Sequence, residues 1–360
     1  MSSEPTSHAA PVMDKAAIAY ALRMAGGLAV PFIVGETLDR PLAFLASVLA
    51  LQLLASRQPP FKLVAGIVAV AAMAIAFFAA ISLTHAVLAL PFLFILAIGL
   101  TVFAALYAQT RSSSPFWFFL SVAVTVTPLM AARSPELAAS LAHALIAGMA
   151  LAVLTTWLMH ALFPEPAQQT SDASAQPPVQ TAMTPAERVR SALAGTLIVM
   201  VLVVLLLNHA SAALVVLVTA LSIVRAAGLA AGTQTAMGLL LGNLIGGGIA
   251  IVAYWVINHA PSLPVLVGVV IVMALFFGER IATAGPKAPL LVVAASSAIL
   301  LLGAGLNPFN DTSTVFAARV GHVLLTTVYT VGMIALFVAA RTERKLETAA
   351  GKLREHEETP

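Results

Sequence analysis

Apolar runs of about 20 residues recur along the chain from residue 17 to residue 340, and each is long enough to cross the ~30 Å hydrocarbon core of a bilayer as a helix. Only 9% of the 360 residues are charged and 60% are hydrophobic, whereas a water-soluble domain is about 25% charged. The sequence therefore predicts an all-α polytopic membrane protein that contacts the lipid bilayer. It contains no cysteine, which excludes disulfides and thiolate metal sites.

About twelve transmembrane helices are expected, arranged as two parallel six-helix repeats. We divide the chain into a cytoplasmic N-terminal tail (1–16), a first repeat (17–162), a flexible cytoplasmic linker (163–187), a second repeat (188–340) and a charged cytoplasmic C-terminal tail (341–360). The linker is predicted because 164–185 is rich in Pro, Gln, Ser and Thr and cannot form a core. Segments 41–56 and 212–224 are short for a span and occupy the same place in both repeats, a pattern that points to a transport site.

The duplication is inferred from a recurring register. The offset between matching residues rises slowly from 170 to 179 positions along the repeat, as small loop insertions would make it do. The matches are Ala50 with Ala220, Pro91 with Pro264, Pro115 with Pro289, and His143 with His322. A duplicated polytopic unit is typical of transporters whose pathway lies between two pseudo-symmetric halves.

The positive residues predict the orientation. If the N-terminus is cytoplasmic, every Lys and Arg falls on the cytoplasmic side of twelve spans except Arg40, Arg133 and Arg319. Positive charge concentrates in cytoplasmic loops, so both termini are expected in the cytoplasm. With six spans in each half, both halves enter the membrane from the same side, which makes the repeats parallel.

His143 and His322, at matching positions in the last helix of each repeat, are candidates for proton coupling and for binding a substrate carboxylate. The alternative is that they hydrogen-bond one helix to another. Arg319 lies one turn before His322 on nearly the same face, and its match in the first repeat is Ser140. A buried Arg needs an anion, either an acid (Asp311, Glu36 or Glu136) or a substrate; the alternative is that it reaches the outer headgroups.

Other candidates lie at helix ends and along one glycine-rich helix. Glu36, near the end of the first span, is a candidate proton carrier or an ordinary loop acid. Asn243 is a candidate substrate-binding residue in a stretch where glycine recurs every four residues. These glycines predict a smooth strip for helix packing and are Gly238, Gly242 and Gly246. Arg23 and Arg190 are expected to reach the inner surface or to attract anions from the cytoplasm.

Two stretches carry a family resemblance. The Arg- and Gly-rich stretch 225–248 and the last-helix segment Ala317-Ala318-Arg319-Val320-Gly321-His322 resemble the fusaric acid resistance and aromatic acid exporter superfamily, as a short member of the uncharacterised DUF2955-like type. The resemblance implies a proton-driven inner-membrane efflux component. It implies small aromatic or other organic acids, or toxic compounds, as cargo and a periplasmic adaptor of the membrane-fusion type as partner. Larger relatives have a sizeable cytoplasmic domain where this chain has only 164–185.

Two functions from different classes remain open. The first is a proton-coupled exporter of small organic anions. The second is a non-transporting membrane subunit of an efflux or envelope complex, in which the glycine strip serves partners; a homo-oligomer is left open in both. No metal cluster, phosphate loop or nucleophile–base pair stands out in the sequence, so no enzymatic activity, cofactor or metal is expected. The net charge of +3 is assigned to cytoplasmic loops and not to nucleic-acid binding.

Overall fold

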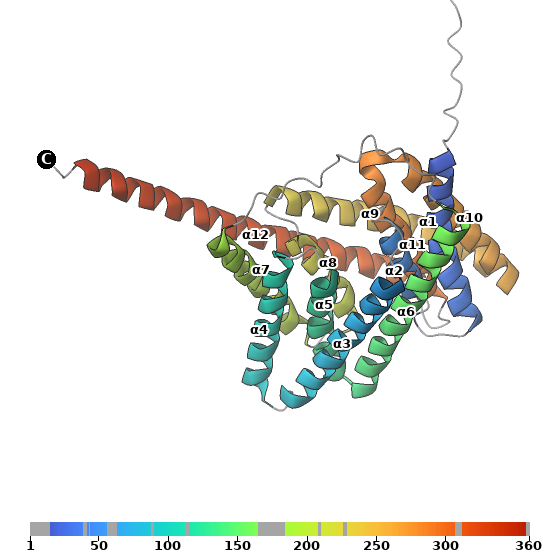
Figure 1. Ribbon diagram of the computed structural model, residues 1–360, viewed down its shortest axis with the longest axis horizontal. Coiled ribbons are helices and arrows are strands. Elements are labelled where there is room, and N and C mark those ends of the chain that lie inside the picture. Colours follow the sequence, from blue (N-terminus) through green and yellow to red (C-terminus); the bar gives the residue numbers. More distant parts are fainter. Residues whose placement is uncertain are drawn as a thin grey trace, which may run out of the picture.

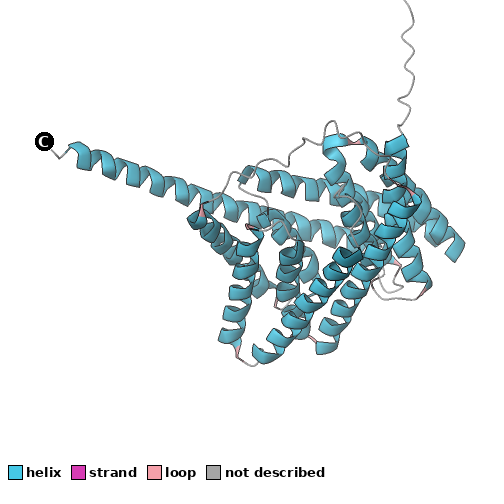
Figure 2. Ribbon diagram, viewed as in Figure 1, coloured by secondary structure: helices cyan, strands magenta, loops and turns pink. Residues whose placement is uncertain are grey.

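A computed structural model describes the backbone of residues 15–38, 42, 44–55, 63–87, 90–111, 115–164, 184–207, 210–225, 229–306 and 312–357. Within these residues the structure is helical throughout, with no strand (Figures 1 and 2). The expected all-α class is therefore confirmed. The tails before residue 15 and after 357, most of the linker and the candidate anion Asp311 lie outside the described residues.

Six α-helices form the first half of the chain. They are α1 (Lys15–Thr37), α2 (Phe44–Ala55), α3 (Leu63–Val87), α4 (Pro91–Gln109), α5 (Pro115–Ala131) and α6 (Pro135–Leu162). Three of them begin with a proline at a position where its missing N–H costs nothing, α4 at Pro91, α5 at Pro115 and α6 at Pro135. The N-cap of α6 is Ser134, whose hydroxyl oxygen accepts a hydrogen bond from the backbone N–H of Leu137.

Six further α-helices form the second half, with a single 3-10 turn among them. They are α7 (Pro185–Leu206), α8 (Ala210–Arg225), α9 (Leu229–His259), α10 (Leu263–Thr283), the turn η1 (Gly285–Lys287), α11 (Ala288–Gly305) and α12 (Thr312–Glu357). A capping box between Thr184 and Glu187 starts α7. The last helix continues past residue 340 and leaves the bundle as one long rod (Figure 1).

Nine helices in the described part of the chain are long and apolar enough to cross a membrane. The other three, α2, α5 and α8, contain 12, 17 and 16 residues. At 1.5 Å per residue α2 is only about 18 Å long, well short of the ~30 Å hydrocarbon core. More than half of α2 is buried, including Ser47 and Ala50, so protein and not lipid surrounds this short helix, as irregular elements at membrane depth require.

The first helix of each half packs along a helix of the other half. α1 packs along α10 of the second half, and α7 packs along α4 of the first. The short helices do the same, because α2 contacts α11 and α8 contacts α5. If each helix number is raised or lowered by six, the α1–α10 pair becomes α7–α4 and the α2–α11 pair becomes α8–α5. Most contacts within the halves have such a counterpart as well; α3 with α5, for example, corresponds to α9 with α11. The packing thus has the pseudo-symmetric pattern that two repeats of six helices would produce.

Gly278 lies at a close contact between α1 and α10. A Cβ at this position would overlap the backbone oxygen of Ala21 and lie 3.2 Å from the backbone nitrogen of Ala25. We expect Gly278→Val to lower the free energy of unfolding by about 1–3 kcal/mol, because overpacking forces the two helices apart. The measurement is the thermal unfolding midpoint in detergent.

Gly268, on the same helix, provides the matched control. A Cβ at Gly268 would meet no described atom within 4 Å, so Gly268→Val should unfold close to the wild-type temperature. Equal destabilisation by the two substitutions would contradict the assignment of Gly278 to the contact between the halves.

Candidate functional site

Asn243, in the middle of α9, is the centre of a buried polar cluster with Ser297 and Arg319. Its side chain is only 5% exposed. Its Oδ1 accepts hydrogen bonds from Ser297 Oγ at 2.9 Å and from Arg319 Nε at 3.0 Å. Its Nδ2 donates to the backbone oxygen of Leu239 at 2.7 Å. One amide therefore links α9, α11 and α12, and both of its polar atoms are in use.

The cluster forms where α9 and α11 come into backbone contact. A Cβ at Gly246 would overlap the backbone oxygen of Ala294, and one at Gly242 would lie 2.6 Å from Val293 Cγ1 and 3.2 Å from the backbone oxygen of Leu290. Glycine at these two positions lets the helices approach closely. Gly238 makes no such contact, because a Cβ there would meet no described atom within 4 Å. The close approach is therefore made by two of the three expected glycines.

Arg319 is half-buried near the start of α12, inside the candidate span Ala317–Ala339. Among the described residues it makes no ion pair, and its only hydrogen bond is the one to Asn243. Glu136, one of the acids considered from sequence, lies at the start of α6 and accepts a hydrogen bond from Ser134. The described structure thus gives this guanidinium a neutral amide as partner.

Polar groups continue along α12 beyond Arg319. Thr326 Oγ1 donates to the backbone oxygen of His322 at 2.6 Å, and His322 itself is half-buried. Thr330 is fully buried, and its hydroxyl has no hydrogen-bond partner among the described residues. Arg319, Thr326 and Thr330 share one helix face because they are seven and four residues apart. At 1.5 Å per residue this polar row is about 16 Å long.

The structure does not bring His143 into the cluster. This residue is exposed on α6, and its Nδ1 lies 2.7 Å from the backbone oxygen of Ala139 in its own helix. α6 packs against α1, α2, α3 and α5, whereas the cluster lies between α9, α11 and α12. The two histidines therefore match in sequence register without any hydrogen bond that joins them.

Glu36 and Arg23 both lie on α1, which packs against α2, α6 and α10. Glu36 is half-buried in the last turn of that helix. Arg23 is only 3% exposed, and its guanidinium carbon lies 5.8 Å from the centre of the Tyr20 ring. Its counterpart Arg190 is exposed on α7. Arg23 is therefore held inside the protein, where the sequence predicted an arginine that reaches the membrane surface.

Sequence reasoning missed Ser297 and Thr330. A pair of serines in an otherwise apolar stretch, Ala294-Ala295-Ser296-Ser297-Ala298, was the available signal for the first. Thr330 gives no comparable signal, since threonine is common in transmembrane helices. No group of His, Asp or Glu that could hold a metal ion is found in the described part of the chain.

Comparison with known proteins covers only the first half. Residues 20–159 match the family model described as Protein of unknown function (DUF2955). This match begins in α1 and ends in α6, so it coincides with the first six-helix unit and does not include the Asn243 cluster. No curated protein and no solved structure matches the chain.

The cluster predicts a strong energetic coupling between Asn243 and Arg319. Asn243→Leu removes the acceptor of two buried donors, which should cost about 1–3 kcal/mol for each unsatisfied group. Adding Arg319→Leu removes one of those donors, so the double variant should be less destabilised than the two single variants added together. Unfolding in detergent measures all three.

Gln234→Leu is the control, because Gln234 is exposed on the same helix; it should unfold like the wild type. Strict additivity of the Asn243 and Arg319 substitutions would show that the hydrogen bond between them carries no coupling energy.

Proposed function

We propose that this protein is a proton-driven exporter of small organic anions, in which Arg319 binds the anionic group of the cargo. The single observation that carries the proposal is an arginine inside a membrane-spanning helix whose described partner is a neutral amide. A charged side chain at membrane depth is costly unless an anion or a polar partner accompanies it. A substrate carboxylate would supply the missing negative charge.

The geometry of Arg319 suits a bidentate anion. Its Nε is held by Asn243, whose position is fixed in turn by Ser297 and by its own helix. Among the described residues the two terminal nitrogens of the guanidinium make no hydrogen bond. These nitrogens can therefore donate to the two oxygens of a carboxylate, which is the strongest arrangement for such a pair.

His322 is the proposed proton-coupling residue. It follows Arg319 by one helical turn and is half-buried. An imidazole changes its charge in the pH range that a cellular proton gradient spans. Because the two groups are neighbours on one helix, a proton on His322 and an anion on Arg319 would influence each other electrostatically. His143 lies on α6 and Glu36 on α1, and their proton-coupling roles stay predictions.

The resemblance described above supports export as the direction and aromatic or other organic acids as the cargo. It also supports a location in the bacterial inner membrane, with both termini cytoplasmic and a periplasmic adaptor as partner. The assembly-subunit alternative receives less support from the packing. Gly242 and Gly246 are covered by α11 of the same chain, so they are not available to a partner helix.

Efflux from intact cells tests the proposal. Cells that express the wild type, with the adaptor co-expressed if required, are loaded with a panel of aromatic carboxylates and followed with and without a proton uncoupler. We expect uncoupler-sensitive efflux that falls about tenfold or more in Arg319→Gln, since a hydrogen bond to a charged group contributes about 1.5–3 kcal/mol. Arg319→Lys should retain part of the activity.

Arg111→Gln serves as the control, because Arg111 is an exposed arginine at the end of α4; at matched expression it should export like the wild type. Wild-type efflux from Arg319→Gln cells would contradict the anion-site assignment, and efflux insensitive to the uncoupler would contradict proton coupling.

A further inference from the structure

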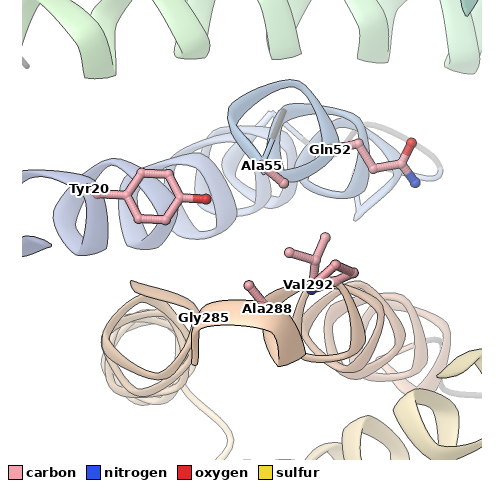
Figure 3. Close-up of a pocket in the computed structure, with 7 residues that line it drawn as sticks. Tyr20, Gln52, Ala55, Gly285, Ala288 and Val292 are labelled. Atoms are coloured by element: carbon pink, nitrogen blue, oxygen red, sulfur yellow. The ribbon is translucent and has the colours of Figure 1, made fainter. Parts of the chain in front are cut away.

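A cavity of about 470 Å³ lies between the two halves, away from the Asn243 cluster. Tyr20 of α1 and Gln52 and Ala55 of α2 form one side, while Ala288 and Val292 of α11 are among the residues on the other (Figure 3). Its size falls within the range of about 300–1,000 Å³ that small-molecule sites occupy. It lies at the ends of the helices that the distribution of positive charge assigns to the cytoplasm.

The repeat explains why this cavity exists. Gly27 on α1 faces Leu54 on α2, and Gly195 on α7 faces Val224 on α8, so Leu54 and Val224 are equivalent at an offset of 170. The next residues in each helix are Ala55 and Arg225, which are therefore equivalent as well.

The same reasoning applies to the facing helices. Pro115 and Pro289 correspond at an offset of 174, which makes Phe118 of α5 equivalent to Val292 of α11. In the α5–α8 interface the Arg225 guanidinium carbon lies 5.7 Å from the centre of the Phe118 ring. In the α2–α11 interface the equivalent residues are Ala55 and Val292, and both line the cavity. The cavity therefore occupies the position that the Arg225 and Phe118 side chains occupy in the α5–α8 interface.

The lining defines the chemistry of a ligand. The walls are mostly apolar, with the Tyr20 phenol and the Gln52 amide as polar groups, and none of the lining residues that the structure describes is acidic. Arg23 lies one turn from Tyr20 and faces its ring, and the exposed Lys287 directly precedes Ala288. A ligand with a flat ring and one negative charge matches an apolar slot that is bordered by cations and contains an aromatic wall.

We propose that this cavity is a binding site for a small aromatic carboxylate. The role of this site in first capturing cargo from the cytoplasm rests on the proposed function. The assignment of a ligand to it rests on the cavity alone. The site is separate from Arg319, because Arg319 lies on α12 and the cavity is lined from α1, α2, η1 and α11.

Equilibrium binding of 1-naphthoate to the purified full-length protein in lipid nanodiscs tests the inference. We expect saturable binding by the wild type and at least about tenfold weaker binding by Val292→Phe, because the added ring occupies the cavity as Phe118 does in the other interface. Gln52→Leu, which keeps the volume and removes the amide, should also weaken binding. Val272→Phe makes the same change at a residue of α10 that is 68% exposed, and it should bind like the wild type.

Three outcomes would overturn the proposal. They are no saturable binding by the wild type, unchanged affinity in both Val292→Phe and Gln52→Leu, and equal affinity for the neutral analogue 1-naphthalenemethanol. Thermal unfolding identifies a variant that fails to fold, and the other variant then decides the result. Arg319→Gln should bind 1-naphthoate in this assay even though it fails to export, so loss of the Arg319 site and loss of the cavity are distinguishable.

Discussion

The backbone contact between α9 and α11 at Gly246 determines where the polar groups of this protein can meet. Because these two helices touch without intervening side chains, Asn243 lies directly beside Ser297. The same amide oxygen then reaches the guanidinium of Arg319 on α12. In a hydrocarbon environment every buried polar group needs such a partner. A larger residue at Gly246 would separate the helices and leave these polar groups without their partners.

The two halves share a packing plan and differ where function is proposed. The contacts of α1 and α7 with the opposite half, and the matching contacts of α2 and α8, agree with the predicted duplication. Arg319 has only Ser140 as its counterpart, so an anion site can form once and not twice. At the cavity, Ala55 and Val292 stand where the other interface has Arg225 over the Phe118 ring. Both proposed sites are therefore local departures from the symmetry.

Sequence reasoning predicted the helices well because apolar runs and proline positions are local signals. The two short segments were recognised for the same reason, and they correspond to α2 and α8. Arg319 and Asn243 were chosen separately as candidates, but their hydrogen bond was not predictable, since it depends on how α9, α11 and α12 pack. The repeat register made His143 and His322 equivalent positions. Register does not determine which face of a helix is buried, however, and His143 is exposed.

Arg23 and the end of α12 show the other limits. The burial of Arg23 depends on tertiary contacts around α1, which no local pattern reveals. The charged stretch after residue 340 was predicted to be a cytoplasmic tail with an amphipathic or frayed helix; a helix does continue to Glu357, but its continuity with the last span was not predicted. The match of the family model to residues 20–159 alone adds that the second half, which holds the Asn243 cluster, must be understood from its own residues.

The most direct test asks whether the Asn243 cluster lines a pathway that water and substrate can enter. Since the chain contains no cysteine, Ser297→Cys introduces a single thiol beside Asn243, and Ala298→Cys introduces one at a fully buried neighbour on the same helix. Labelling by a charged, membrane-impermeant methanethiosulfonate reagent is then followed in membrane vesicles. The account predicts that Ser297→Cys is labelled, that an exported aromatic acid slows the labelling, and that Ala298→Cys stays unlabelled. If Ser297→Cys is as unreactive as Ala298→Cys, the cluster is a packing device and the anion pathway lies elsewhere.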